Sequence, residues 1–317
     1  MTTKIRCIYI GNHGLHNTET HVTEALERAG HTVHRVQEAY GVWVSALPQA
    51  LATQPDFVLW THTGRLDHDY ASQLRALNDL KDAGIPTVGY HLDLFWGVHR
   101  ASLIGVDPFF NVRTLITPDA DHDDLWSDAG LDHRVLPPAT NMADAMLIGR
   151  FRQEIAADVA FVGSWHNYHP EWLHRRELVH RMQQRTSFRS WPAAGEVRGQ
   201  ALGDVIASTK IMVGDSCWPD GPGGYHSDRI PVTLGRGGFL LHPWSEQLGD
   251  IYEDGVHLRY WPLGDWKELD KLIAYYLAHP QQRQTIAIQG RRHVIDNHTF
   301  DNRVPGIIKA AMSVKVP

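Results

Sequence analysis

A repeated alternation of short apolar strands and amphipathic helices constrains the fold of this chain more than any other feature. Apolar runs at residues 5–10, 56–60 and 114–117 alternate with helical patterns such as residues 18–29 and 70–83, and a further strand is expected at residues 256–260. Strands that alternate with helices form parallel sheets covered by helices, because each connection between neighbouring strands must cross the sheet. The pattern therefore predicts an α/β protein built from doubly wound, Rossmann-like sheets.

The alternation runs through both halves of the 317 residues. Two domains of about 150 residues each fit this length better than one. Pro137 and Pro138 close the first series of strands and helices, and we expect the linker between residues 139 and 157. The predicted divisions are a first domain at 1–150, a second at 151–300 and a closing helical segment at 301–317.

A glycine-rich turn followed by a short helix is predicted near the middle of the second half. Gly224 precedes Ser227 and Asp228, which are both good N-cap residues, and Arg229 falls in the first helical turn. Free backbone N–H groups, the positive helix end and an arginine together suit a diphosphate. An ordinary loop–helix–strand unit explains the same residues about equally well.

Further candidates for nucleotide contacts follow the predicted strand ends of the second half. Gly163 and Ser164 come directly after an apolar strand, so their loop can approach a phosphate closely. Trp191 and His166 also follow strand ends, and we expect Trp191 to stack on a nucleobase. The chain has 11 tryptophans, so most of them must simply pack in the core.

Four segments of the second half carry a resemblance to a known family. They are FVGS at 161–164, SDRI at 227–230, GRGGFLL at 235–241 and IAIQGRRHVIDNHTF at 286–300. In this order they resemble the CgeB-like, spore-maturation group of glycosyltransferases. The resemblance implies a GT-B fold, in which two Rossmann-like domains face a cleft and the second binds a nucleotide-sugar. It also implies a C-terminal helix that crosses back to the first domain.

One position departs from the pattern of that group. The group commonly has a glutamate three residues after the arginine, where it is expected to hold the donor ribose, and here the residue is Val232. Valine has no hydrogen-bonding side chain. Another residue therefore holds the ribose, the nucleotide sits differently, or donor binding is weaker.

The candidate catalytic bases lie in the first half. His13 and His16 follow the first strand, in a loop that lacks the G-x-G-x-x-G and P-loop patterns. Histidine titrates near neutral pH, and Gly11 leaves room beside His13. Asp93 is the other candidate, because aromatic neighbours can raise the pKa of a carboxyl group; a helix N-cap is the alternative. The chain has 21 histidines, so a functional role for any single one is not the default.

No metal site and no bound cofactor are expected. The run of carboxylates from Asp119 to Asp124 imitates a D-x-D metal motif, but an acidic helix start is the simpler interpretation. His13, His16 and His21 lack the spacing and the cysteine partners of a zinc site. The nucleotide-sugar is therefore expected as a co-substrate, without a metal.

Composition narrows the environment and the partners. Residues 1–150 carry 11 Lys and Arg against 18 Asp and Glu, so the first half offers no general attraction to nucleic acid. No apolar run is long enough to span a membrane, and Cys7 and Cys217 form no metal pattern. Cytoplasmic residence, with Cys7 as a buried thiol, is the default expectation.

The combined prediction is a metal-independent GT-B glycosyltransferase with a nucleoside-diphosphate sugar donor, expected to be UDP-linked. The acceptor stays open among proteins, glycans, small molecules and, as the only nucleic acid, hydroxylated bases of DNA. A nucleotide-sugar epimerase on the same fold and a non-catalytic nucleotide-sugar binder are the alternatives.

Overall fold

The computed structural model describes residues 4–39, 42–62, 69–165, 169–191 and 197–313. These residues divide into two compact units. The first unit consists of residues 1–96, 100–137 and 300–317, and the second of residues 97–99 and 138–299. Pro137 and Pro138 therefore lie on either side of a unit boundary.

The first unit is a six-stranded sheet in the order β2-β1-β3-β4-β5-β6, and every neighbouring pair is parallel. The strands are β1 (Arg6–Gly11), β2 (Thr32–Gln37), β3 (Phe57–Trp60), β4 (Thr87–Tyr90), β5 (Thr114–Thr117) and β6 (Asp132–Val135). The helices are α1 (Thr18–Arg28), α2 (Trp43–Leu51), α3 (Tyr70–Asp82), α4 (Asp123–Asp128) and α12 (Phe300–Met312), with the 3-10 turn η3 (Pro108–Asn111). A further 3-10 turn, η2 (His99–Leu103), has its first residue in the second unit and the rest in the first.

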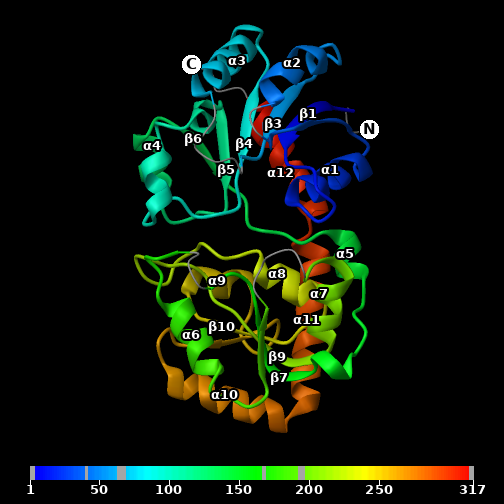
Figure 1. Ribbon diagram of the computed structural model, residues 1–317, viewed down its shortest axis with the longest axis vertical. Coiled ribbons are helices and arrows are strands. Elements are labelled where there is room, and N and C mark those ends of the chain that lie inside the picture. The colour runs from blue at the N-terminus through cyan, green and yellow to red at the C-terminus, as the bar shows by residue number, and fades with distance from the viewer. Residues whose placement is uncertain (1–3, 40–41, 63–68, 166–168, 192–196, 314–317) are drawn as a thin grey trace. The chain divides into compact units, whose positions relative to one another are not determined.

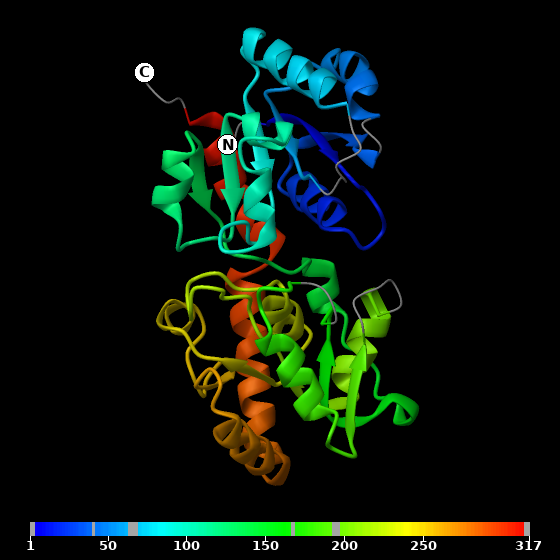
Figure 2. The same ribbon diagram turned by 60° about the vertical axis from the view of Figure 1, so that its left-hand side comes forward.

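Helices cover both faces of the first sheet. Apolar residues of α2 and α3 pack with Ile8, Ile10 and Trp60 in one core cluster. On the other side α12 packs against α1, β4 and β5, and Figures 1 and 2 show it running beside the strands although it is last in the sequence. The closing segment of the chain therefore belongs structurally to the first unit.

The second unit is a five-stranded sheet in the order β11-β10-β9-β7-β8, again with parallel pairs. Its strands are β7 (Ala157–Val162), β8 (Phe188–Trp191), β9 (Thr209–Val213), β10 (Leu240–Pro243) and β11 (Arg259–Trp261). Its helices are α5 (Met142–Met146), α6 (His174–Met182), α7 (Gly199–Ala207), α8 (Arg229–Gly235), α9 (Glu246–Ile251), α10 (Trp266–Ala278) and α11 (Pro280–Asn297), with the 3-10 turn η4 (Gln153–Ile155).

Both sheets share one topology. The first strand of each unit lies between the second and the third, so the strand order reverses beside β1 in one sheet and beside β7 in the other. Doubly wound sheets bind ligands outside the carboxyl ends of the strands at such a reversal point. The fold thus defines one candidate edge in each unit.

One predicted strand began too early, and the predicted linker region contains a short helix. A strand was expected from residue 256, but β11 begins only at Arg259, because Gly255 (φ +72°) turns the chain and its N–H donates to the Leu258 carbonyl at 2.8 Å. The expected linker contains the helix α5, whose N-cap Asn141 accepts the Ala143 N–H at 3.0 Å.

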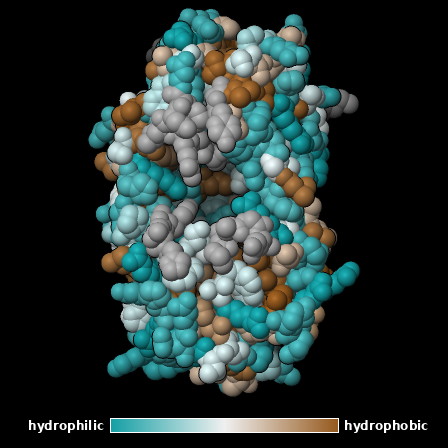
Figure 3. Space-filling model, in the orientation of Figure 1, coloured by the Kyte–Doolittle hydropathy of each residue, from teal (hydrophilic) through white to brown (hydrophobic). Residues whose placement is uncertain are grey.

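In the described part of the chain, no helix is both long and apolar enough to cross a membrane. Hydrophilic residues also predominate on the face drawn in Figure 3, with hydrophobic ones scattered among them.

Candidate functional site

Arg229 lies across the reversal point of the second sheet. Its Nε donates to the carbonyl of Val162, the last residue of β7, at 2.7 Å, and its Nη1 donates to the carbonyl of Asp215, just after β9, at 3.3 Å. Its guanidinium carbon is 5.0 Å from the centre of the buried Phe161 ring. A cation is therefore fixed at the edge where such sheets bind ligands.

Gly163 allows the arginine to come this close. It follows β7 with φ +143°, and a Cβ atom there would lie 2.3 Å from Nη2 of Arg229. Its N–H donates to the carbonyl of Trp191, at the end of β8, at 2.9 Å. Gly163, Trp191 and Arg229, which the sequence suggested separately, are thus neighbours within one unit.

A buried carboxylate that sequence analysis missed supports the arginine. Asp215 is fully buried, and it accepts hydrogen bonds from Arg175 Nε at 2.6 Å and Trp172 Nε1 at 2.7 Å. Burial alone would raise the pKa of Asp215, but the charges of Arg175 and Arg229 and the hydrogen bond with His174 hold it well below its usual range. An aspartate next to a strand-end glycine was the only sequence signal for it.

Two arginines and a buried carboxylate meet at this edge. Arg175 and Arg229 are two fixed cations close to one ionised carboxylate, Asp215. Arg175 Nη1 also donates to the carbonyl of Ser164 at 3.3 Å, which positions the loop after β7. Asp228 is exposed one residue before Arg229, so an anionic ligand here would be attracted by the two fixed cations and not by a net positive charge.

The start of α8 contributes less than the sequence suggested. Asp228 occupies the N-cap position without a capping hydrogen bond, and Ser227 Oγ accepts the Arg229 N–H at 3.3 Å instead. The N–H of Ser227 donates to Ser216 Oγ at 3.3 Å, and that of Ile230 to the Ser227 carbonyl at 3.1 Å. Since α8 has only 7 residues and these N–H groups are engaged, the start of the helix offers little to an anion, and the charged group at this edge is the Arg229 side chain.

The glycine-rich turn before α8 is held in place from several sides. The carbonyl of Gly223 accepts from Ser245 Oγ at 2.8 Å, and Gly224 is buried. Trp218 is buried and donates to the Tyr225 carbonyl at 2.6 Å, so it packs in this turn and is not open for stacking.

The aromatic residues near the strand ends of the second unit differ in position. Trp165 packs against the core cluster of the unit. Trp191 is half-buried at the strand end beside Gly163. His166 lies outside the described residues.

The first-unit candidate His13 follows β1, next to the reversal point of that sheet. Its Nε2 is 3.0 Å from the Tyr9 carbonyl, its ring packs edge-on against Tyr9, and its backbone N–H donates to Gln37 at 3.2 Å. Burial lowers the pKa of His13 from 6.5, although the carbonyls of Tyr9 and Val36 oppose the shift. The ring is therefore neutral at pH 7, as a proton acceptor must be.

His16 and Asp93 have different surroundings. His16 is exposed on the loop after β1. Asp93, after β4, forms an ion pair with Arg100 at 2.7 Å, and its backbone N–H donates to His91 Nδ1 at 3.1 Å.

A second network that sequence analysis missed lies at the carboxyl edge of the first sheet. His62, after β3, has one ring nitrogen hydrogen-bonded to Glu38 and the other 3.2 Å from Asp107. Trp60 donates to Glu38 at 2.9 Å, and Tyr70 to Asp107 at 3.3 Å. Burial alone would lower the pKa of His62, but the two carboxylates raise it to about 9. His62 is thus a cation at neutral pH and no general base.

The acidic run after β5 is a helix start, as predicted. Asp123 and Asp124 occupy the first turn of α4. Asp119 is buried and accepts hydrogen bonds from His122 Nδ1 at 2.9 Å and the Asp121 N–H at 3.1 Å. Cys7 is a buried thiol, also as predicted, and burial raises its pKa.

A hollow of about 640 Å³ lies elsewhere on the second unit. It is lined near the amino ends of β7, β8 and β9, by Asp158, Ser187 and Lys210 among others. The reversal-point residues do not line it. The hollow therefore lies at the opposite edge of the sheet from the carboxyl ends, where ligands bind in this type of fold.

A family model described as glycosyl transferase-like matches residues 147–309, just over half of the chain. The chain belongs to this family. The matched region contains Gly163, Asp215 and Arg229, so the family assignment and the fixed cation fall in the same unit. No curated protein matches the chain.

Solved glycosyltransferase structures share the fold. Sucrose-phosphate synthase of Thermosynechococcus elongatus matches with a TM-score of 0.65 at 11% identity, over 96% of this chain and 98% of that one. HepE of Anabaena with UDP and glucose gives 0.62 at 11%, over 97% and 100%. An alpha-glucosyltransferase with UDP and a 13-mer DNA gives 0.65 at 9%, over 97% and 100%. The likeness confirms the predicted GT-B fold class, with its two doubly wound units.

Proposed function

We propose that this glycosyl transferase-like protein transfers a sugar from a UDP-linked donor to a hydroxyl group of an acceptor. The family assignment supports a glycosyltransferase. HepE was solved with UDP-glucose, and the alpha-glucosyltransferase with UDP, which makes UDP the first nucleotide to test. Membership of the CgeB-like group, which the sequence suggests, is part of the same proposal.

The observation that carries the proposal is the fixed cation at the reversal point of the second sheet. Arg229 is held by the carbonyls of Val162 and Asp215, and a second cation, Arg175, lies beside it. Such an arrangement binds a diphosphate without reorganisation, because the charges already point to one place.

The proposed donor contacts follow from this position. Arg229 and Ser227 hold the diphosphate together with the loop of Gly163 and Ser164. Trp191 stacks on the base, and Gly224, Asp228 and His166 complete the candidate contacts.

The proposed reaction is a substitution at the anomeric carbon of the donor sugar. The acceptor oxygen forms a bond to that carbon while the bond to the diphosphate oxygen breaks, and UDP leaves with the electron pair. Arg229 stabilises the charge that develops on the leaving group, as a preorganised cation does. We propose that no metal takes part in this step.

A base accepts the acceptor's proton if the reaction inverts the anomeric centre. His13 is the first candidate, because burial keeps its ring neutral at pH 7. Asp93 is the second, and the exposed His16 is the third.

The acceptor is the open part of the proposal. One structural neighbour was solved with DNA, but residues 1–150 of this chain carry 18 acidic against 11 basic residues. This charge disfavours a polyanionic acceptor. Proteins, glycans and small molecules are therefore the first acceptors to test, ahead of hydroxylated DNA bases.

A mass-spectrometric screen of nucleotide-sugars tests the proposal. We expect one UDP-sugar to raise the thermal stability of the protein and to be consumed, with or without EDTA, when hydroxyl-bearing acceptors are present. A product isomeric with the donor, formed without acceptor, would identify an epimerase. Stabilisation without turnover in any acceptor pool would identify a non-catalytic binder and contradict the transferase.

A further inference from the structure

The turn between β7 and α6 carries two side chains of types that bind metals, His169 and Glu171, with one residue between them. The N–H of Trp172 donates to the His169 carbonyl at 3.0 Å and closes the turn. The Trp172 side chain also donates to the buried Asp215 at 2.7 Å, which ties the turn to the interior of the second unit. The two side chains are therefore presented by a fixed piece of backbone.

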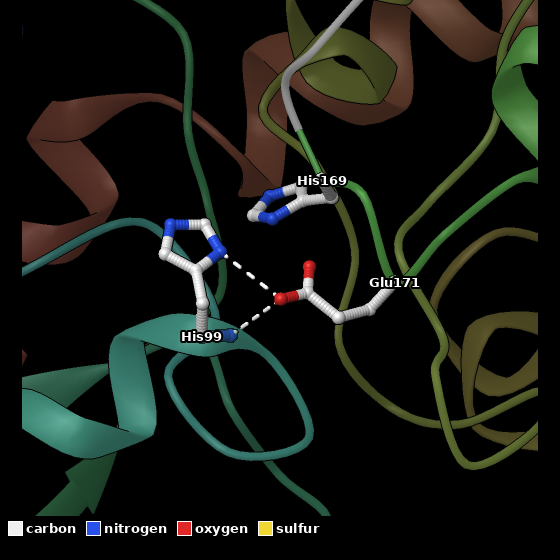
Figure 4. Close-up of side chains that lie close together, drawn as sticks. All are labelled: His99, His169 and Glu171. Carbon is white, nitrogen blue, oxygen red and sulfur yellow. Dashed lines mark hydrogen bonds and ion pairs between the residues drawn. The ribbon is translucent and has the colours of Figure 1, made fainter.

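His99 adds a third ligand-type side chain. It is the first residue of η2 and groups with the second unit. Its backbone N–H donates to Glu171 Oε1 at 2.8 Å, and its ring Nδ1 is 3.2 Å from the same oxygen. Figure 4 shows the three side chains pointing toward one another.

The spacing of the three groups suits a small cation. One ligand atom from each residue lies within 4.8 Å of the other two. Zinc bonds of about 2.0–2.1 Å in a tetrahedral site place ligand atoms about 3.3 Å apart. The His99–Glu171 separation already meets this value, and the ligand atom of His169 lies within 4.8 Å of the other two.

We propose that His99, His169 and Glu171 bind one Zn²⁺ ion. Two imidazoles and a carboxylate are ligands that zinc prefers, and three protein ligands leave one position for water. His169 is buried, whereas His99 and Glu171 are exposed, so the ion can enter from solvent. The ion fixes the turn that carries Trp172 to Asp215 and takes no part in sugar transfer, so this proposal does not rest on the proposed function.

Titration of the metal-free full-length protein with Zn²⁺ tests the site, followed by calorimetry and, with Co²⁺ as a probe, by visible absorption. We expect one tight site with a tetrahedral Co²⁺ spectrum. His169→Ala and Glu171→Gln should each weaken it by at least about tenfold, because each removes one of three protein ligands. His99→Ala, at an exposed position, gives the same test should the buried substitution impair folding.

The control addresses the other histidines of the chain. His293→Ala alters a separate group of histidines. The ring centres of His293 and His257 are 4.0 Å apart, and Nε2 of His293 lies 3.1 Å from Nε2 of His298. It should leave the tight site unchanged. Equal zinc affinity in wild type and in all three ligand variants, or loss of binding only in His293→Ala, would overturn the proposal and leave adventitious histidine binding.

Discussion

At the scale of single residues, two cations and a buried carboxylate lie where the strand order of the second sheet reverses. Arg229 is held by two main-chain carbonyls, and Gly163 leaves the space that its guanidinium fills. Such a braced arginine loses little conformational freedom when it binds an anion, so more of the interaction energy appears as affinity.

The candidate bases can be separated by substitution. His13→Ala or Asp93→Asn, whichever removes the true base, should lower kcat by about 10²- to 10⁴-fold with donor affinity unchanged. Steady-state kinetics measures kcat, which should fall, and calorimetry measures the Kd for UDP, which should stay the same. His16→Ala tests the third candidate in the same way, and the exposed His34→Ala serves as the control. Near-normal kcat in all three would exclude an inverting mechanism with these bases and point to a retaining enzyme.

Val232 provides a second test at this scale. It is half-buried in α8, three residues after Arg229, and not part of the closed core. Val232→Glu should leave the fold intact and keep or tighten UDP binding, since a carboxylate can accept hydrogen bonds from the ribose. Val232→Gln separates the added charge from the added length. Loss of thermal stability in both variants would mean that the position is packed.

The sequence indicated which residues are suited to bind a nucleotide, but not which residues contact each other in the fold. Gly163 and Arg229 stood out because a glycine after a strand and an arginine after a cap are local patterns. Their contact joins residues that are far apart in the chain, and so do the bonds of Asp215 to Arg175 and of His62 to Asp107. Long-range pairing leaves no periodic signal, which explains why both networks were missed.

At the scale of elements, the loops after β7 and β9 are held by α6. The side chain of Arg175 reaches from α6 to Asp215 and to the Ser164 carbonyl. The types and the order of the elements could be predicted from the apolar periodicity. The turn at residues 254–258 could not, because it depends on a side chain: Asp254 accepts the Tyr260 N–H at 2.9 Å.

Removing the ion pair between Arg175 and Asp215 should lower the stability of the protein. Asp215→Asn leaves Arg175 buried without its charge partner, and we expect the free energy of unfolding to fall by about 3–5 kcal/mol. Urea denaturation measures it. Asp158→Asn, whose ion pair with Lys210 is at the surface, is the matched control and should cost less than about 1 kcal/mol. Equal losses in the two variants would contradict the proposed role of Asp215.

The His62 network predicts a pH dependence of the first unit. Burial lowers the pKa of His62, but Asp107 and Glu38 raise it to about 9, above its unfolded value. Its contribution, at most about 3 kcal/mol, is complete below about pH 6.5 and disappears as pH rises through 9. Urea unfolding of wild type and His62→Gln should therefore converge between pH 7 and 10. The free energy of unfolding of the exposed variant His34→Gln should follow that of wild type at every pH. A difference between wild type and His62→Gln that does not change with pH would exclude the linkage.

At the scale of the whole molecule, two sheets of the same strand order carry different charges. The fixed cations lie in the second unit, whereas residues 1–150 hold an excess of acidic side chains. This division was predictable from charge counting and from the alternation of strands and helices. The family match falls mainly on the unit with the cations, at residues 147–309.

The most direct measurement is calorimetric titration of the protein with UDP. Arg229→Ala should weaken binding at least about tenfold, because a charge-assisted contact is worth roughly 1.5–3 kcal/mol. Arg292→Ala removes an equal charge from a side chain of the same unit that is 85% exposed, and it should bind UDP as wild type does. Equal UDP affinity for Arg229→Ala and wild type, with both folded, would contradict the central claim that the reversal point of the second sheet binds the donor diphosphate.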